Sequence, residues 1–421
     1  MVLKNDHFYY SILLRGSFAL LSFLIVVAMA RYFGPELMGA YSFLMACFSL
    51  LLIPFTTGIA RFNTRYVAKD SFKAKYRALK ILAEELHLAL SLSLICLILV
   101  LLLFYLEANS AYIALACLFP FAVFVNAEMS LLRGLGHYKL GNLDGMLLRP
   151  LFLLIGIVGM DFYKIEMSII SVANLFCVAY ILSRIVLIPF IRWPSFQHAT
   201  VLKILITKKI RYMVAMLTVV GAVDVLAIHL DVFVLASVST MSQVANFKIA
   251  ATIKTLALLP VQSFNLFLPA ILAPLSAQST AIDLGDTVRR LILINLIFVL
   301  VFVTFFSIFG QFFISMIFGE QYSETFLITL PFLLAISIGA LCGPSVETLV
   351  GLGGEKVLLL ITILSTTVSV FLNMYLSPKI GGLGASISSS IGYALLFIIS
   401  AGYVKVRYKL DTSVLLFLKN N

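Results

Sequence analysis

Apolar stretches of about 20 residues recur along nearly the whole chain, and short polar segments separate them. A helix of about 20 apolar residues crosses a hydrocarbon layer about 30 Å thick and satisfies its own backbone hydrogen bonds there. The pattern predicts an all-α integral membrane protein with about twelve transmembrane helices. The predicted spans cover residues 9–30, 38–60, 85–106, 111–132, 141–160, 167–190, 212–236, 242–267, 288–309, 327–349, 357–376 and 383–404.

Two longer polar segments, 61–84 and 191–211, interrupt the apolar pattern. The second divides the predicted spans into two equal sets, so we expect two lobes of about six helices each around a central cavity. The expected lobes are residues 1–195 and 196–421. A weak internal repeat supports this division, because Gly39 to Ser42 align with Ala245 to Lys248, and Pro54 aligns with Pro260.

The composition excludes an ordinary soluble protein. Hydrophobic residues make up 62% of the chain and charged residues 12%, against about half apolar and about a quarter charged in soluble domains. Lys4 precedes the first span without a small-residue cleavage site after it, so we expect this span to be retained and not removed as a signal peptide.

The chain has a net charge of +11, and the positions of its basic residues predict the membrane topology. Most lysines and arginines fall in the tails and in alternate loops, whereas the loops of the opposite side hold Arg31, Lys164 and Lys379. This asymmetry predicts cytoplasmic N- and C-termini and requires no nucleic acid. The five cysteines lie inside predicted spans without metal-ligand spacing, so we expect no metal site.

Charged side chains inside predicted spans are functional candidates, because each costs at least about 2.5 kcal/mol at the bilayer centre. The predicted depths put Asp231 level with Lys248 and Asp224 level with Lys254, as a ladder between two neighbouring helices. Such a ladder serves either as structural ion pairing or as a site for substrate or a coupling cation.

Two arginines suit an anionic ligand such as a phosphate. Arg15 and Arg149 lie at similar predicted depths, with Asp144 as the acid close in sequence. Guanidinium groups bind phosphate oxygens through paired hydrogen bonds, although both side chains could instead extend to the membrane interface. We expect Arg61 and Arg65 to form a cytoplasmic basic rim that contacts anionic lipids. Arg184 lies nearer to a span end and is expected to extend to the interface, while Glu128 and Glu347 are expected to pair with interfacial groups.

Three motifs carry a resemblance to a known family. Arg31 to Ser42 includes Gly-Pro-Glu followed by Gly-Ala-Tyr, Phe318 to Tyr322 reads Phe-Gly-Glu-Gln-Tyr, and Gly381 to Ala385 reads Gly-Gly-Leu-Gly-Ala. Together they resemble the polysaccharide transporter family, the Wzx-type O-antigen flippases of the multidrug/oligosaccharidyl-lipid/polysaccharide exporter superfamily. The corresponding turn of the second half, Ser239 to Ala245, lacks Gly-Pro-Glu.

The resemblance implies a flippase in a bacterial cytoplasmic membrane. It would move an undecaprenyl-pyrophosphate-linked oligosaccharide to the outer leaflet by alternating access, coupled to H+ or Na+, without a cofactor. Its expected partners are membrane lipids and polysaccharide assembly proteins.

Two alternatives to the flippase stay open. An organic-cation antiporter would need a cavity dominated by acids, whereas the lysines near Asp224 and Asp231 offset them. An O-antigen polymerase or ligase would need catalytic groups in a large external loop, and the predicted external loops are short. The chain has no ATP-binding or hydrolase motif, so we expect a transporter and not an enzyme.

Overall fold

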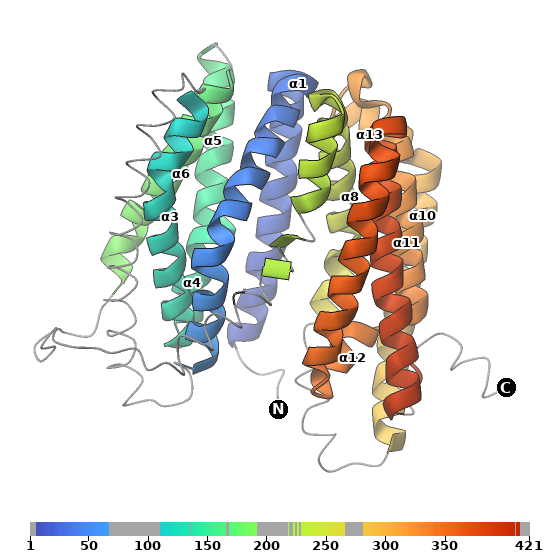
Figure 1. Ribbon diagram of the computed structural model, residues 1–421. Helices are drawn as coiled ribbons and strands as arrows, with labels where there is room; N and C mark the ends of the chain where they lie inside the picture. The colour runs from blue at the N-terminus through green and yellow to red at the C-terminus, as the bar shows by residue number, and fades with distance from the viewer. Residues whose placement is uncertain are drawn as a thin grey trace, which may run out of the picture. The chain divides into compact units, whose positions relative to one another are not determined.

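The described part of the chain is entirely helical (Figure 1). The computed structural model describes residues 6–66, 110–135, 137–165, 168–191, 218, 222–223, 225–226, 229–265, 281–408 and 410–412. Its longer helices are α1 (Asp6–Tyr66), α3 (Ser110–Gly134), α5 (Arg149–Phe162), α6 (Ile169–Leu187), α8 (Met241–Asn265), α10 (Ala281–Ile317), α11 (Thr325–Cys342) and α13 (Glu355–Tyr408). Short helices are α4 (Tyr138–Leu143), the π-helix η3 (Asp144–Leu148), the 3-10 turns η4 (Ile188–Phe190) and η5 (Glu320–Tyr322), and α12 (Ser345–Gly351).

The chain is a multi-pass membrane protein. Seven segments within the described residues are long and apolar enough to cross a membrane. They are Leu13–Ile53, Ser110–Gly134, Tyr138–Phe162, Ile169–Phe190, Asn295–Ile317, Thr325–Cys342 and Lys356–Tyr408. Large apolar side chains on them are exposed, such as Phe162 at 78% and Leu334 at 67%. Lipid is the environment in which such surfaces are stable.

Two of these segments each contain two predicted spans. Helix α1 is broken at Gly34, where φ is 75°, between the predicted spans 9–30 and 38–60. Helix α13 is broken at Ile380 and Gly381, where φ of the glycine is 55°, between the predicted spans 357–376 and 383–404. A positive φ is accessible to glycine at little cost. The count of about twelve spans stays a prediction, and span 85–106 lies outside the described residues.

Three observed elements differ from their predicted spans. The predicted span 327–349 is divided into α11 and α12, because Gly343 has φ of 68° and Pro344 follows it. Helix α10 continues beyond both ends of the predicted span 288–309. Helix α8 covers residues 242–265 of the predicted span 242–267 but is not among the seven apolar segments. Lysines and amides along it lower its hydropathy, and one of the amides, Asn246, is buried within the protein.

The chain divides into two compact units. Unit 1 comprises residues 1–33 and 44–229, and unit 2 comprises residues 34–43 and 230–421. Apolar side chains of α1, α3 and α6 form a core in unit 1, including Phe48, Leu118 and Tyr180. In unit 2, α11 lies against α8, α10 and α13, and Leu258, Val299 and Ile336 belong to its core. The division at residue 195 stays a prediction.

Candidate functional site

A buried ion pair joins α3 to α6 inside unit 1. Arg184 donates a hydrogen bond to Glu128, with 2.5 Å between Nη2 and Oε1. The side chain of Glu128 is 1% exposed and that of Arg184 is 12% exposed. The expectation that Arg184 extends to the interface and that Glu128 pairs with interfacial groups is therefore wrong, because the two side chains pair with each other inside the unit.

A second ion pair in unit 1 depends on a π-helical turn. Residues Asp144–Leu148 form η3, and this wider turn brings residues five positions apart to the same side of the helix. Arg149 donates through Nη2 to Oδ2 of Asp144. Its guanidinium also lies 3.5 Å from the centre of the Tyr180 ring. A phosphate at Arg149 would consequently have to compete with the carboxylate of Asp144.

The two ion pairs form one electrostatic cluster, because Asp144 and Glu128 interact with each other. Two carboxylates and two guanidiniums give this cluster no net charge. One atom in each side chain has no hydrogen-bond partner among the described residues, namely Glu128 Oε2, Asp144 Oδ1, Arg149 Nε and Arg184 Nη1.

The other candidates of the first half differ in how much the structure describes. Arg15 on α1 is exposed, and no ion pair or hydrogen bond joins its side chain to another described residue. Arg61 and Arg65 lie near the end of α1, but their side chains fall outside the described part. Asp224 in the seventh predicted span also lies outside it.

Asp231 is the centre of a polar cluster in unit 2. It is 8% exposed and lies on the helix His229–Val238. Asn373 Nδ2 donates to its Oδ1 at 3.1 Å, and Ser389 Oγ donates to its Oδ2 at 2.5 Å. Ser369 supplies a further side-chain hydrogen bond. All three neutral partners belong to α13, so the two sections of this broken helix hold the carboxylate between them.

Lys254, and not Lys248, is the lysine that interacts electrostatically with Asp231. Helical side chains lean toward the N-terminus of their helix, so the long Lys254 side chain reaches back along α8. Lys248 lies about 120° around the helix from Lys254, which gives it different neighbours. The Nζ of Lys254 lies 4.7 Å from the centre of the Phe332 ring and 5.1 Å from that of Tyr393. The predicted pairing of Asp231 with Lys248 is therefore wrong.

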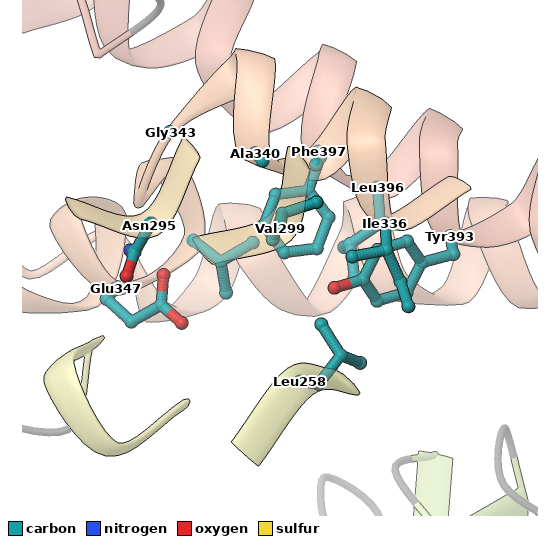
Figure 2. A pocket seen from close by; sticks show the side chains of 12 residues that line it. Leu258, Asn295, Val299, Ile336, Ala340, Gly343, Glu347, Tyr393, Leu396 and Phe397 are labelled. Atoms are coloured by element: carbon teal, nitrogen blue, oxygen red, sulfur yellow. The ribbon is translucent and has the colours of Figure 1, made fainter. Parts of the chain in front are cut away.

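A cavity of about 230 Å³ lies within unit 2 (Figure 2). Its walls are mostly apolar, and they come from α8, α10, α11, α12 and α13. Asn295 and Glu347 lie close together in Figure 2, and the Tyr393 ring extends from its helix toward their side of the cavity. Glu347, which the sequence predicts to pair with interfacial groups, lines this cavity.

The neutral polar partners on α13 and α10 are not among the residues that the sequence pattern marks as candidates. Asn373 and Asn295 lie inside apolar predicted spans, and Ser389 belongs to the polar run Ser386 to Ser390. An amide inside a membrane helix needs a hydrogen-bond partner. That requirement could have marked these residues, but it does not identify the partner.

Comparisons with solved structures give the fold. A multidrug resistance MATE family transporter of the MOP superfamily in an inward-facing conformation has a TM-score of 0.73 at 16% identity, covering 94% of this chain and 98% of that chain. The lipid II flippase MurJ has a TM-score of 0.71 at 15% identity, covering 98% of this chain and 89% of that chain. A MOP superfamily transporter from Pyrococcus furiosus, described as having a binding pocket of reverse polarity, has a TM-score of 0.61 at 14% identity over 96% of this chain and 98% of that chain.

Neither the protein-family models nor the sequences of curated proteins gave a match. The expectation of a Wzx-type flippase is therefore supported only at the level of the fold. Nearly the whole chain has the fold shared by the MATE transporters and the lipid II flippase of the MOP superfamily.

Proposed function

We propose that this chain is a transporter that flips a lipid-linked oligosaccharide across a bacterial cytoplasmic membrane. The proposed substrate is an undecaprenyl-pyrophosphate-linked O-antigen or a related repeat unit. Ion-coupled alternating access would move it from the cytoplasmic to the outer leaflet. The fold likeness to a lipid II flippase supports a lipid-linked substrate, and so do the sequence motifs in residues 31–42, 318–322 and 381–385.

The observation that carries the proposal is the exposed Arg15 on a membrane helix. Among the described arginines of the candidate site, Arg149 and Arg184 have carboxylate partners, whereas Arg15 has none within the described residues. An arginine without a counter-ion in a membrane helix is costly unless it contacts an anion or water. The pyrophosphate of a lipid-linked sugar is an anion whose oxygens match the guanidinium geometry.

Other charged residues have supporting roles in this proposal. Lys248 and Lys254 on α8 add positive charge to unit 2. Arg149 would become available to a phosphate once its ion pair with Asp144 is broken. Asp231, which α13 surrounds with neutral polar side chains, is the proposed ion-coupling residue. Asp224 and the basic residues Arg61 and Arg65 remain proposed contributors to charge pairing and lipid contact.

Replacement of Arg15 tests the proposal in the native host. Loss of a charge-assisted contact worth about 1.5–3 kcal/mol predicts that Arg15→Ala lowers surface glycan about tenfold or more, while Arg15→Lys retains part of it. Arg407→Ala, which removes an exposed arginine at the end of α13, serves as the matched control. Immunoblots of surface glycan and of the membrane-inserted protein provide the readouts. Normal glycan display in the Arg15→Ala strain would contradict the proposal.

A cation antiporter is the second candidate function, and the cavity of unit 2 favours it. Glu347 and aromatic residues line that cavity, and organic cations bind to such combinations of a carboxylate and aromatic rings. Efflux of a fluorescent organic cation from cells distinguishes the two functions. Efflux that Glu347→Gln abolishes, together with glycan display that Arg15→Ala leaves unchanged, would select the antiporter.

A further inference from the structure

Polar and aromatic groups link the cavity of unit 2 to Asp231. Tyr393 lines the cavity, and the Nζ of Lys254 lies 5.1 Å from the centre of its ring. Lys254 interacts electrostatically with Asp231, while Glu347 of the cavity interacts electrostatically with Tyr393. The Tyr393 ring therefore lines the cavity and also lies near the ammonium group of Lys254, which interacts with Asp231.

The cavity has the size and polarity to hold water. Its volume of about 230 Å³ is several times the space of about 30 Å³ that one water molecule takes in the liquid. Ordered water also needs polar partners, and Glu347, Asn295 and Tyr393 bring oxygen and nitrogen atoms to the lining (Figure 2). Water in this cavity would reach the edge of the Tyr393 ring.

The surroundings of Asp231 suit a proton better than a metal ion. Asn373 turns its Nδ2 toward Asp231, because its Oδ1 accepts a hydrogen bond from Ser377. Ser389 donates to the other carboxylate oxygen, so hydrogen-bond donors already face both oxygens. A hard metal cation needs several oxygen ligands that are free to coordinate it. A proton needs only one acceptor.

We propose that the cavity is a water-filled entrance through which protons reach Lys254 and Asp231, with Tyr393 as the gate, and that the ion exchanged at Asp231 is a proton. A proton from cavity water binds the carboxylate of Asp231, and it returns to water by the reverse step. This inference rests on the proposed role of Asp231 in ion coupling.

The charged and titratable groups around this route come from several elements. Helix α8 contributes Lys254, and α12 contributes Glu347. Helix α13 contributes Tyr393, together with Asn373 and the neutral serines that contact Asp231. On α10 the polar group is the neutral Asn295. The section of α1 that belongs to unit 2 places Phe43 against Phe233, which adds no charge. His229 stands two positions before Asp231 on the same helix. Burial and the hydrogen bond from Ser389 therefore act most strongly on the protonation of Asp231, and Lys254 is the charged group that acts on it.

Infrared difference spectroscopy after a pH jump tests the route on the full chain in lipid vesicles. The carboxyl band that disappears in Asp231→Asn reports protonation of Asp231. Filling the cavity with Ala340→Leu is expected to slow the protonation of Asp231 about tenfold, which corresponds to about 1.4 kcal/mol of barrier. Removing the gate with Tyr393→Ala is expected to accelerate it. The end point of the titration should stay the same in Ala340→Leu, because that variant changes access and leaves the contacts of Asp231 intact.

Two further variants serve as a substitute for Ala340→Leu and as a control for added bulk. Val299→Leu fills the same cavity from α10 and replaces Ala340→Leu if that variant fails to fold. Leu341→Phe adds bulk to an exposed position of α11, where the side chain is 49% exposed, and it should leave the rate unchanged. Wild-type rates in both cavity-filling variants would overturn the route.

Sodium provides the second arm of the test. Exchange of KCl for NaCl at constant ionic strength and pH should leave the Asp231 band unchanged. A sodium-specific shift of that band would overturn the assignment to a proton. Failure of the flippase proposal is recognised separately, because it appears as normal glycan display in the Arg15→Ala strain whatever the spectra show.

Discussion

At the scale of single residues, the charges of unit 1 are stabilised in pairs. The pairs Asp144–Arg149 and Glu128–Arg184 are buried, and each side chain depends on its partner for compensation of its charge. Breaking a buried pair by removing one partner costs about 3–5 kcal/mol, whereas replacing both partners with apolar residues is often neutral. The charge of Arg149 consequently contributes to folding, besides any contact with a substrate.

Replacement of Arg149 alone is expected to destabilise the protein more than replacement of the whole pair. We expect Arg149→Met to lower the thermal unfolding temperature of the detergent-solubilised chain, since it leaves Asp144 buried without compensation. The double variant Arg149→Met with Asp144→Leu should recover most of that loss. Fluorescence-monitored thermal unfolding measures both effects. Arg15→Met, at an exposed position without a described partner, is the matched control, and equal unfolding temperatures for Arg149→Met and wild type would contradict the prediction.

At the scale of helices, the section of α1 in unit 2 makes a close approach to the start of α8. A β-carbon at Gly39 would lie 1.8 Å from the carbonyl oxygen of Met241. A backbone atom cannot move away as easily as the end of a side chain. The two helices can therefore meet at this distance only because residue 39 has no side chain.

Substitution of Gly39 is expected to be destabilising, while the same change elsewhere on α1 is not. We expect Gly39→Ala to cost about 1–3 kcal/mol through overpacking. Gly16→Ala, on the same helix with nothing within 4 Å of its added β-carbon, should instead gain up to about 1 kcal/mol of helix propensity. Unfolding temperatures and yields of monodisperse protein compare the two variants. Equal stability of both variants would show that the close approach is absent.

Elements that depend on local sequence could be predicted, whereas contacts between distant segments could not. Apolar length is a local property, so the positions of α3 and α6 follow from the sequence. The break at Gly34 falls in the gap between the predicted spans 9–30 and 38–60, which also follows from apolar length. Contacts between distant segments carry no such signal. Asn373 lies 142 positions from Asp231, and the position of Lys254 relative to Asp231 depends on side-chain direction as well as on helix depth.

At the scale of the whole molecule, the asymmetry of basic residues predicts the orientation in the membrane. The short turn with η5 precedes α11 and carries the acids Glu320 and Glu324, whereas the end of α13 carries Lys405 and Arg407. Cytoplasmic loops are enriched in lysine and arginine. The η5 turn is therefore expected outside and the end of α13 inside. In that orientation α12, which contributes Glu347 to the cavity, lies toward the cytoplasm.

Labelling of single cysteines tests this orientation in a bacterial host. Ser323 in the turn and Arg407 at the end of α13 are both exposed, so a cysteine at either position is accessible to reagent. We expect a membrane-impermeant maleimide to label Ser323→Cys in intact spheroplasts and Arg407→Cys only after lysis, on a background in which the native cysteines are replaced by serine or alanine. The reverse pattern would place the cavity toward the outside. Protons would then enter at Tyr393 from the outer face. The orientation therefore decides from which side of the membrane Asp231 receives its proton.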